Sequence, residues 1–167
     1  MINLTDRDTH VNKVSNFYKQ EKYDESIQYY DKALAIDPLY IEALNGKANI
    51  LQELKRYDEA IQYYDKMLAL EISDVHPLNG KAFALAKFDK NEDALPLITK
   101  VLESNPNKEY YLSTAALIMY NLGKIEDAKS YFKKALQINS NLTSILSEKE
   151  LTAFNKIMNN TKQYRIS

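Results

Sequence analysis

Apolar residues recur along the chain at the spacing of amphipathic helices, and one segment of this pattern returns at a fixed interval. The segment from Tyr23 to Leu34 reads YDESIQYYDKAL, and the segment from Tyr57 to Leu68 repeats it almost unchanged as YDEAIQYYDKML. The interval is 34 residues, and two further steps reach similar segments that begin near residues 91 and 125. The sequence therefore contains four copies of one unit.

Each unit holds two runs of apolar and small residues, and the spacings within each run place them on one side of a helix. In the second run a small residue is followed four positions later by a large one, and four positions further on by a leucine. These columns are Ser26, Ala60, Ala94 and Ala128, then Tyr30, Tyr64, Ile98 and Phe132, then Leu34, Leu68, Leu102 and Leu136. The first runs contain Leu44, Ala48, Leu51 and Leu54, then Leu78, Ala82, Leu85 and Phe88, then Leu112, Ala116, Met119 and Leu122. We predict that each unit is a helix, a short turn and a second helix.

This pattern resembles the tetratricopeptide repeat, whose units are closed by a proline as Pro38 and Pro106 close two units here. The resemblance covers about residues 7–142. It implies an all-α fold, a right-handed superhelical array of antiparallel helix hairpins known as an α-solenoid. The units are then 7–40, 41–74, 75–108 and 109–142, and we expect residues 1–167 to form a single domain.

The chain departs from the usual repeat at several positions. Lysine and alanine stand at Lys47 and at Lys81, with their following alanines, where the family usually has leucine and glycine; we expect each lysine stem to lie along its hairpin with the charge in water. Pro96 lies early in a predicted helix and should delay its start or bend its first turn. The first unit is the weakest, with His10 and Lys13 among its substitutions, as terminal repeats often are.

The repeat register fades after residue 142. Residues 147–150 read as a capping box, and an apolar stripe follows at Leu151, Phe154, Ile157 and Met158. We predict a capping helix over 143–160 that covers the last hairpin, and a polar tail over 161–167. The alternative is that this stripe recruits a helix of a partner.

Composition narrows the possible functions. The 167 residues include no cysteine, which excludes disulfides, thiolate zinc sites and a catalytic thiol. The formal net charge is −1, and the interleaved charges lack the basic excess of a nucleic-acid binder. No stretch has the length and hydrophobicity of a secretory signal or membrane span, so we expect a cytoplasmic protein without membrane partners.

The sequence contains no catalytic constellation. His10 and His76 are the only histidines, and neither is accompanied by the serine or carboxylate pattern of a triad. Acidic pairs such as Asp24-Glu25 recur once per unit at the start of the second helix, where negative charge favours the helix dipole. Motifs for phosphate, zinc or calcium binding are absent. We therefore expect no enzyme activity, no metal and no cofactor.

In the family that the repeat resembles, the first helices line a concave groove. Carrying those positions across implies a surface that is rich in amides in its middle and aromatic at its C-terminal end, which suits a peptide or protein segment as the ligand. The alternative is an ordinary solvent-facing surface with incidental aromatic residues. The candidate residues are Tyr18, Asn45, Asn49, Gln52, His76, Asn79, Phe83, Tyr110, Leu117 and Tyr120.

The leading functional hypothesis is a protein-interaction scaffold whose partner is unknown. A self-associating structural array is the alternative, and an RNA-binding helical array is less favoured because the charge is near neutral. Arrays that clamp the acidic tails of heat-shock chaperones need cations to hold a carboxylate. The matching positions do not supply them in either frame, since they are Val11, Ser15, Gly46, His76 and Gly80, or Asn45, Asn49, Gly80, Tyr110 and Thr114.

Overall fold

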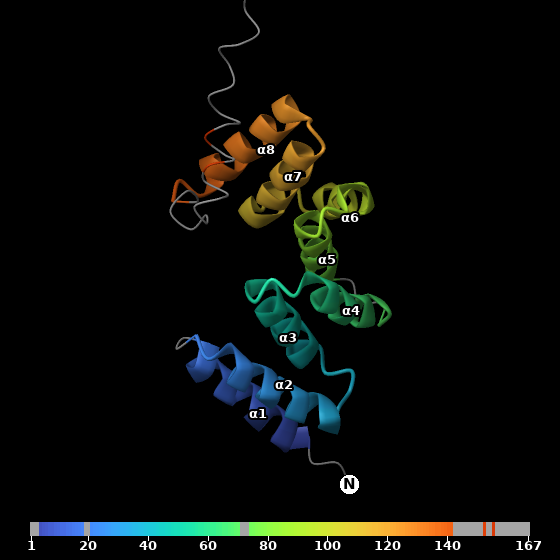
Figure 1. Ribbon diagram of the computed structural model, residues 1–167, viewed down its shortest axis with the longest axis vertical. Helices are drawn as coiled ribbons and strands as arrows, with labels where there is room; N and C mark the ends of the chain where they lie inside the picture. Colours follow the sequence, from blue (N-terminus) through green and yellow to red (C-terminus); the bar gives the residue numbers. More distant parts are fainter. Residues whose placement is uncertain (1–3, 19–20, 71–73, 142–151, 153–154, 156–167) are drawn as a thin grey trace, which may run out of the picture. The chain divides into compact units, whose positions relative to one another are not determined.

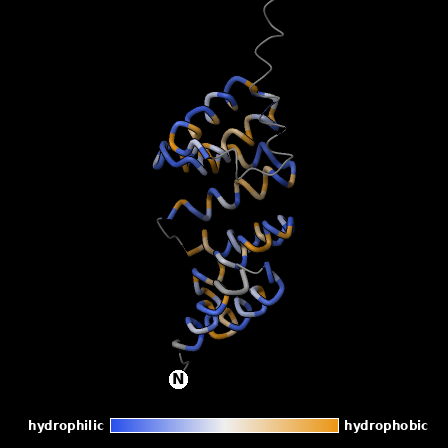
Figure 2. The backbone as a smooth tube through the Cα atoms, turned by 90° about the vertical axis from the view of Figure 1, so that its left-hand side faces the viewer, coloured by the Kyte–Doolittle hydropathy of each residue, from blue (hydrophilic) through white to orange (hydrophobic). Residues whose placement is uncertain are grey.

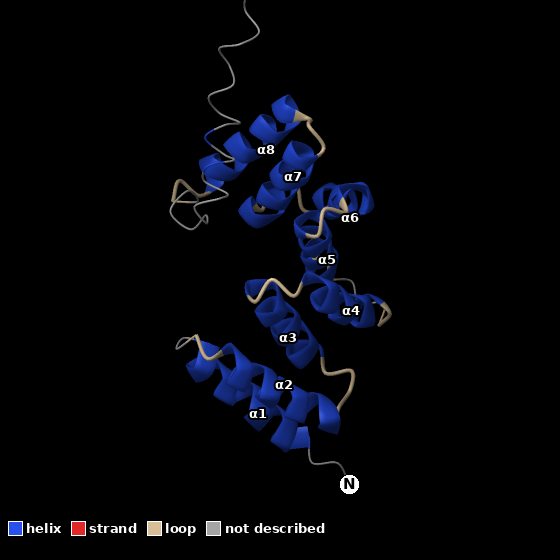
Figure 3. Cartoon of the chain, in the orientation of Figure 1, coloured by secondary structure: helices blue, strands red, loops and turns tan. Residues whose placement is uncertain are grey.

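The computed structural model describes residues 4–18, 21–70, 74–141, 152 and 155, and most of these lie in helices joined by turns (Figure 1). No strand occurs within these ranges, which confirms the predicted all-α fold (Figure 3). The helices are α1 (Leu4–Tyr18), α2 (Tyr23–Ile36), α3 (Ile41–Glu53), α4 (Tyr57–Leu68), α5 (His76–Lys87), α6 (Asn91–Ser104), α7 (Glu109–Asn121) and α8 (Ile125–Ile138).

The chain divides into two compact units, which are described separately. Unit 1 is Met1–Phe88 and contains α1 to α5, and unit 2 is Asp89–Ser167 and contains α6 to α8. In unit 1 each helix packs against the next along the chain, and in unit 2 α7 packs against both α6 and α8. The division falls between α5 and α6, inside the third predicted repeat, so the single domain remains a prediction. The predicted capping helix and tail lie outside the described residues, apart from two isolated positions.

The second helices of the four repeats begin at Tyr23, Tyr57, Asn91 and Ile125, which are 34 residues apart as predicted. Each carries its acidic pair in the first turn. The prediction that Pro96 delays the start of its helix is wrong, because α6 begins in the same column as the others and includes Pro96. Proline has a helical φ angle, and at this early position it removes a single backbone hydrogen bond.

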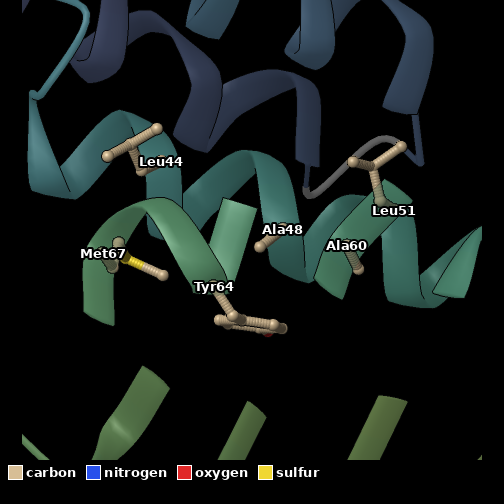
Figure 4. Close-up of a cluster of buried hydrophobic side chains, with 6 residues drawn as sticks. All are labelled: Leu44, Ala48, Leu51, Ala60, Tyr64 and Met67. Carbon is tan, nitrogen blue, oxygen red and sulfur yellow. The ribbon is translucent and has the colours of Figure 1, made fainter. Parts of the chain in front are cut away.

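The predicted small and large columns form the cores of both units. In unit 1, Leu44, Ala48 and Leu51 of α3 pack with Ala60, Tyr64 and Met67 of α4, and all six are buried (Figure 4). In unit 2, Leu112 and Ala116 of α7 pack with Phe132 and Ala135 of α8. Burying one leucine-sized side chain contributes roughly 1.5 to 3 kcal/mol, so these faces hold the hairpins together. Hydrophobic and hydrophilic positions accordingly alternate along the helices (Figure 2).

Two predicted core columns are less buried than expected. The leucines at the end of each second run are only half-buried, although Leu34, Leu102 and Leu136 still pack against a core cluster. Phe88 follows the last residue of α5 and is 48% exposed. The sequence period therefore identifies the face of a helix more reliably than it identifies how deeply each residue on that face is buried.

A left-handed residue occurs in the turn inside every repeat. These residues are Glu21, Lys55, Asp89 and Gly123, with φ between 56° and 73°, and they lie 34 residues apart. In the second repeat the N–H of Arg56 donates to the carbonyl of Leu51 at 2.8 Å and so closes the end of α3. Only the fourth repeat uses glycine, the residue for which this conformation carries no steric cost.

A tyrosine and a glycine sixteen residues apart join successive hairpins in unit 1. A Cβ atom at Gly46 would lie well inside 3.0 Å of the Tyr30 ring, and a Cβ at Gly80 would meet the Tyr64 ring in the same way. Glycine is therefore required where each ring crosses the following helix. The large column fills the space between hairpins because the facing position has no side chain.

Lysines and aspartates connect the same pairs of helices. Lys47 of α3 is paired with Asp31 of α2, and Lys81 of α5 is 2.5 Å from Asp65 of α4. The Lys47 ammonium also lies 4.8 Å from the centre of the Tyr63 ring, and its side chain is only 12% exposed. The expectation that these lysine charges lie free in water is therefore wrong, because an aspartate of the preceding hairpin is within reach of each.

Candidate functional site

Three candidate residues lie along one side of α3. Asn45, Asn49 and Gln52 are separated by four and three positions, the spacing of neighbours on a helix face. Asn49 is exposed, and the other two are half-buried. His76, Asn79 and Phe83 follow the same spacing on α5, where His76 is exposed and the other two are half-buried. We call these six residues the unit 1 binding face.

Gln52 connects the two helices of this face. Its Nε2 donates a hydrogen bond to the carbonyl of Gly80 in α5 at 2.8 Å. Because this bond uses the amide nitrogen as the donor, the Gln52 Oε1 atom is left as an acceptor with no partner among the described residues. The structure therefore brings Gln52 and the α5 backbone together, as the resemblance implies.

Asn49 is held by a buried tyrosine. The hydroxyl of Tyr64 donates a hydrogen bond to Asn49 Oδ1 at 2.9 Å. Tyr64 belongs to α4, is 1% exposed, and has a pKa raised by burial, so its hydroxyl remains protonated. The exposed Asn49 amide is thus oriented from below by a core residue.

The α5 residues have a mixed polar and apolar character. Asn79 Oδ1 is buried and has no hydrogen-bond partner among the described residues, which is an uncommon state for a polar atom. The ring of Phe83 lies 5.2 Å from the ammonium of Lys87, one turn further along the helix. This side of α5 therefore offers an unused acceptor beside an aromatic ring.

His76 lies at the N-terminal end of α5. Both its backbone N–H and its ring Nδ1 lie 2.9 Å from Asp74 Oδ1. Burial alone would raise the pKa of Asp74, but these hydrogen bonds outweigh it and lower the pKa below its ordinary value. His76 is thus positioned at the edge of the binding face by an ionised aspartate.

The unit 2 candidates lie on α7 and are mainly apolar. Tyr110, Leu117 and Tyr120 are all half-buried, and the Tyr110 ring is 4.2 Å from the ring of Tyr111, centre to centre. The hydroxyl of Ser113, which shares their face, donates to its own helix at the carbonyl of Glu109. In contrast to unit 1, this face leaves few unused polar groups.

The remaining candidate is Tyr18, the last residue of α1, whose side chain is not among those described. Phe83 belongs to unit 1 and Tyr120 to unit 2, so their joint action on one ligand remains a prediction. Two residues that position the site were not among the candidates. Tyr64 was assigned only to the core, although the Tyr and Gly spaced by sixteen residues, at Tyr30 and Gly46 and again at Tyr64 and Gly80, offered a signal in the sequence.

Within the described part of the chain, no group of three or more His, Asp or Glu side chains is arranged to hold a metal ion. The helices there were also compared with the requirements of a membrane span, and each is too short or too polar to cross a bilayer.

Two family models of the tetratricopeptide repeat match the chain, one over residues 11–74 and one over residues 109–142. The chain is a tetratricopeptide repeat protein. The second match coincides with the fourth predicted unit, and the first covers most of the first unit and all of the second. No curated protein matches the sequence.

Solved structures resemble this tetratricopeptide repeat protein in fold. MamA from Desulfovibrio magneticus RS-1, from residue 41 to its end, is 18% identical with a TM-score of 0.71, over 92% of this chain and 93% of that one. YrrB, described as a TPR protein with an unusual peptide-binding site, is 19% identical with a TM-score of 0.64, over 93% of this chain and 86% of that one. At these identities the likeness establishes the fold alone.

Proposed function

We propose that this chain is a protein-interaction module, not an enzyme, and that it binds an extended peptide or protein segment in a groove lined by its first helices. The fold supports the general role, since one similar structure is described as having a peptide-binding site. The unit 1 binding face supports the location, because its polar side chains belong to neighbouring first helices and are joined there by Gln52 and Gly80.

The unused hydrogen-bonding capacity of this face is the observation that carries the proposal. Asn79 Oδ1 is a buried acceptor without a partner among the described residues, and Asn49 still has both of its N–H donors. Leaving a buried polar atom unpaired costs roughly 1 to 3 kcal/mol, so a ligand that supplies the missing donor recovers this cost. An extended peptide presents a backbone N–H and C=O at every residue other than proline.

The same face indicates what kind of segment fits. Phe83 is half-buried and offers an aromatic surface for one apolar side chain of the ligand. A terminal carboxylate is a poor ligand, because the Tyr30 and Tyr64 rings occupy the space beside Gly46 and Gly80 where a cationic or amide side chain would be needed. The proposal therefore favours an internal extended segment over a charged chain end.

Selection of peptides followed by substitution on α5 tests this proposal. A phage library of random twelve-residue peptides is selected on the full chain, and the affinity of each recovered peptide is measured by fluorescence anisotropy. Changing both Asn79 and Phe83 to alanine should weaken binding more than tenfold, since aromatic anchors often dominate an interface. Neither change should reduce stability strongly, because both side chains lie outside the core clusters.

The matched control changes Lys32 and Lys66 to alanine. Both are exposed on second helices, beside the rings of Tyr29 and Tyr63, and should alter affinity less than twofold. If the α5 variant and the control bind the selected peptides equally well, recognition lies elsewhere and the proposed groove is wrong. Recovery of no binding peptide, together with a molecular mass that rises with protein concentration, would favour the self-associating array instead.

A further inference from the structure

Side chains from three successive helices meet at Gly80. The Tyr64 ring projects from α4 (Figure 4) and passes over Gly80 of α5, where even a Cβ atom would collide with it. Its hydroxyl reaches Asn49 Oδ1 of α3 at 2.9 Å. Gln52, also of α3, donates to the Gly80 carbonyl. The bare glycine thus lets a buried side chain contact an exposed one on the binding face.

The direction of the hydrogen bond between Tyr64 and Asn49 follows from burial. The Tyr64 hydroxyl stays protonated, and Asn49 Oδ1 is its one hydrogen-bond acceptor among the described residues. A buried hydroxyl that did not donate would lose this bond and retain its desolvation cost. The Asn49 oxygen therefore faces Tyr64, and its Nδ2 with two N–H groups is turned away from that hydroxyl.

Packing alone does not account for the hydroxyl group. The corresponding positions in unit 2 are Ile98 and Phe132, which are buried and carry no polar atom. The column therefore accepts an apolar side chain as its filler, and a phenylalanine would serve in the same space. What Tyr64 adds is a polar contact to an exposed amide that the core does not need.

We propose that Tyr64 is a positioning residue for ligand binding. It fixes the Asn49 amide so that Nδ2 donates to a backbone carbonyl of an extended peptide, while the unpaired Gln52 Oε1 accepts from a backbone N–H of the same peptide. This inference rests on the proposed function and adds to it the class of ligand group that is recognised, namely the peptide backbone. Recognition of this kind depends little on the ligand's side chains, and Phe83 then supplies selectivity.

A double-mutant cycle tests this role, with the selected twelve-residue peptides as the probe. Tyr64→Phe keeps the ring and removes the hydroxyl, and should weaken binding about three- to tenfold, the range of one hydrogen bond. Asn49→Ala should weaken binding by at least as much. In the Asn49→Ala background Tyr64→Phe should have no further effect, because Tyr64 acts through Asn49. Additive losses in the double variant would overturn the inference.

Two further variants separate the donor from the packing. Asn49→Asp keeps an oxygen for the Tyr64 hydroxyl but removes both N–H donors, so it should lose as much affinity as Asn49→Ala. Tyr63→Phe is the matched control: it removes a hydroxyl from the adjacent residue of α4, whose ring lies beside Lys47, and should leave affinity unchanged. Equal loss from Tyr63→Phe would show a general effect on stability and would contradict the proposed role.

The free protein provides a test that needs no ligand. The Asn49 side-chain NH₂ signals in a nitrogen-15 NMR spectrum should move when Tyr64 becomes phenylalanine and should stay in place when Tyr63 does. If the peptides bind the α5 face but Tyr64→Phe binds them as tightly as the original chain, the positioning role fails while the proposed function stands. If no peptide binds at that face, the proposed function fails and the inference falls with it.

Discussion

Both units contain a junction where the second helix of one repeat packs against the first helix of the next, and the two junctions are built from different residues. Between α4 and α5 the large residue is Tyr64 and the facing position is Gly80, which has no side chain. Between α6 and α7 the corresponding residues are Ile98, also buried, and Thr114, whose hydroxyl donates to the carbonyl of Tyr110. The larger residue is matched by a glycine and the smaller one by a threonine.

This difference shows that the repeat conserves a filled volume at the junction rather than a particular residue type. Cores tolerate exchanges that keep total volume and penalise those that do not. The exchange also changes the neighbouring exposed face, because only tyrosine sends a hydroxyl toward the first helix. In unit 1 that hydroxyl meets Asn49, whereas in unit 2 the equivalent position is Leu117, which has no polar atom to bond.

The largest expected effect is the loss of the ring at the unit 1 junction. Tyr64→Ala should reduce the free energy of unfolding by about 3 to 5 kcal/mol, the range for large-to-small changes in a packed core. Urea unfolding followed by circular dichroism measures this. A loss below about 1 kcal/mol would show that the ring is not packed between hairpins as described.

Filling the glycine should have the next largest effect. Gly80→Ala places a Cβ against a buried ring that has little room to move, so we expect a loss of about 1 to 3 kcal/mol from overpacking. Importing the unit 2 pair, as Tyr64→Ile with Gly80→Thr, should cost less than the sum of the two single changes. Strict additivity in urea unfolding would mean that the two junctions are not interchangeable in volume.

Much of the fold could be predicted from the sequence because burial repeats with a period. The small column at Ser26, Ala60, Ala94 and Ala128 is buried throughout, and the helices begin in the predicted columns. Ser26 fits a column of alanines because its hydroxyl donates to the carbonyl of Lys22 at 3.0 Å. Such regularities follow from local spacing, which the sequence displays directly.

The candidate site was less predictable because it depends on distances between helices. Asn49 and Gln52 were identified from their column, but their partners Tyr64 and Gly80 lie 15 and 28 residues away in sequence. The ion pair of Lys47 with Asp31 was missed for the same reason, since the spacing within one hairpin says nothing of the preceding hairpin's side chains. Pairwise polar contacts of this kind require the packed structure.

The turns give a smaller effect that also contrasts the units. Lys55 in unit 1 and Gly123 in unit 2 occupy the same left-handed position, with φ of 60° and 73°. Lys55→Gly should raise the free energy of unfolding by up to about 1 kcal/mol, and Gly123→Ala should lower it by about 1 kcal/mol. Changes of the same sign for both variants in urea unfolding would contradict the shared turn conformation.

The smallest expected effect comes from the ion pairs that only the unit 1 junctions contain. Asp31→Asn removes the partner of Lys47, whereas the equivalent position at the unit 2 junction is Thr99, which carries no charge. Asp31 is 53% exposed, so the expected loss of stability is below about 1 kcal/mol and should shrink in 1 M salt. Asp65→Asn, at the next junction, should behave alike.

The pH dependence of this last effect has a definite sign. Burial alone would lower the pKa of Lys47, but its bonds to Asp31 and Tyr63 outweigh burial and raise the pKa. A raised lysine pKa stabilises the folded chain fully below the unfolded value of about 10.4 and is lost as pH rises through the folded value. The difference in unfolding free energy between the original chain and Asp31→Asn should therefore stay constant from about pH 7 to 9 and fall above about pH 10.4. A difference that already declined between neutral pH and pH 9 would show that the ammonium of Lys47 is not held by Asp31.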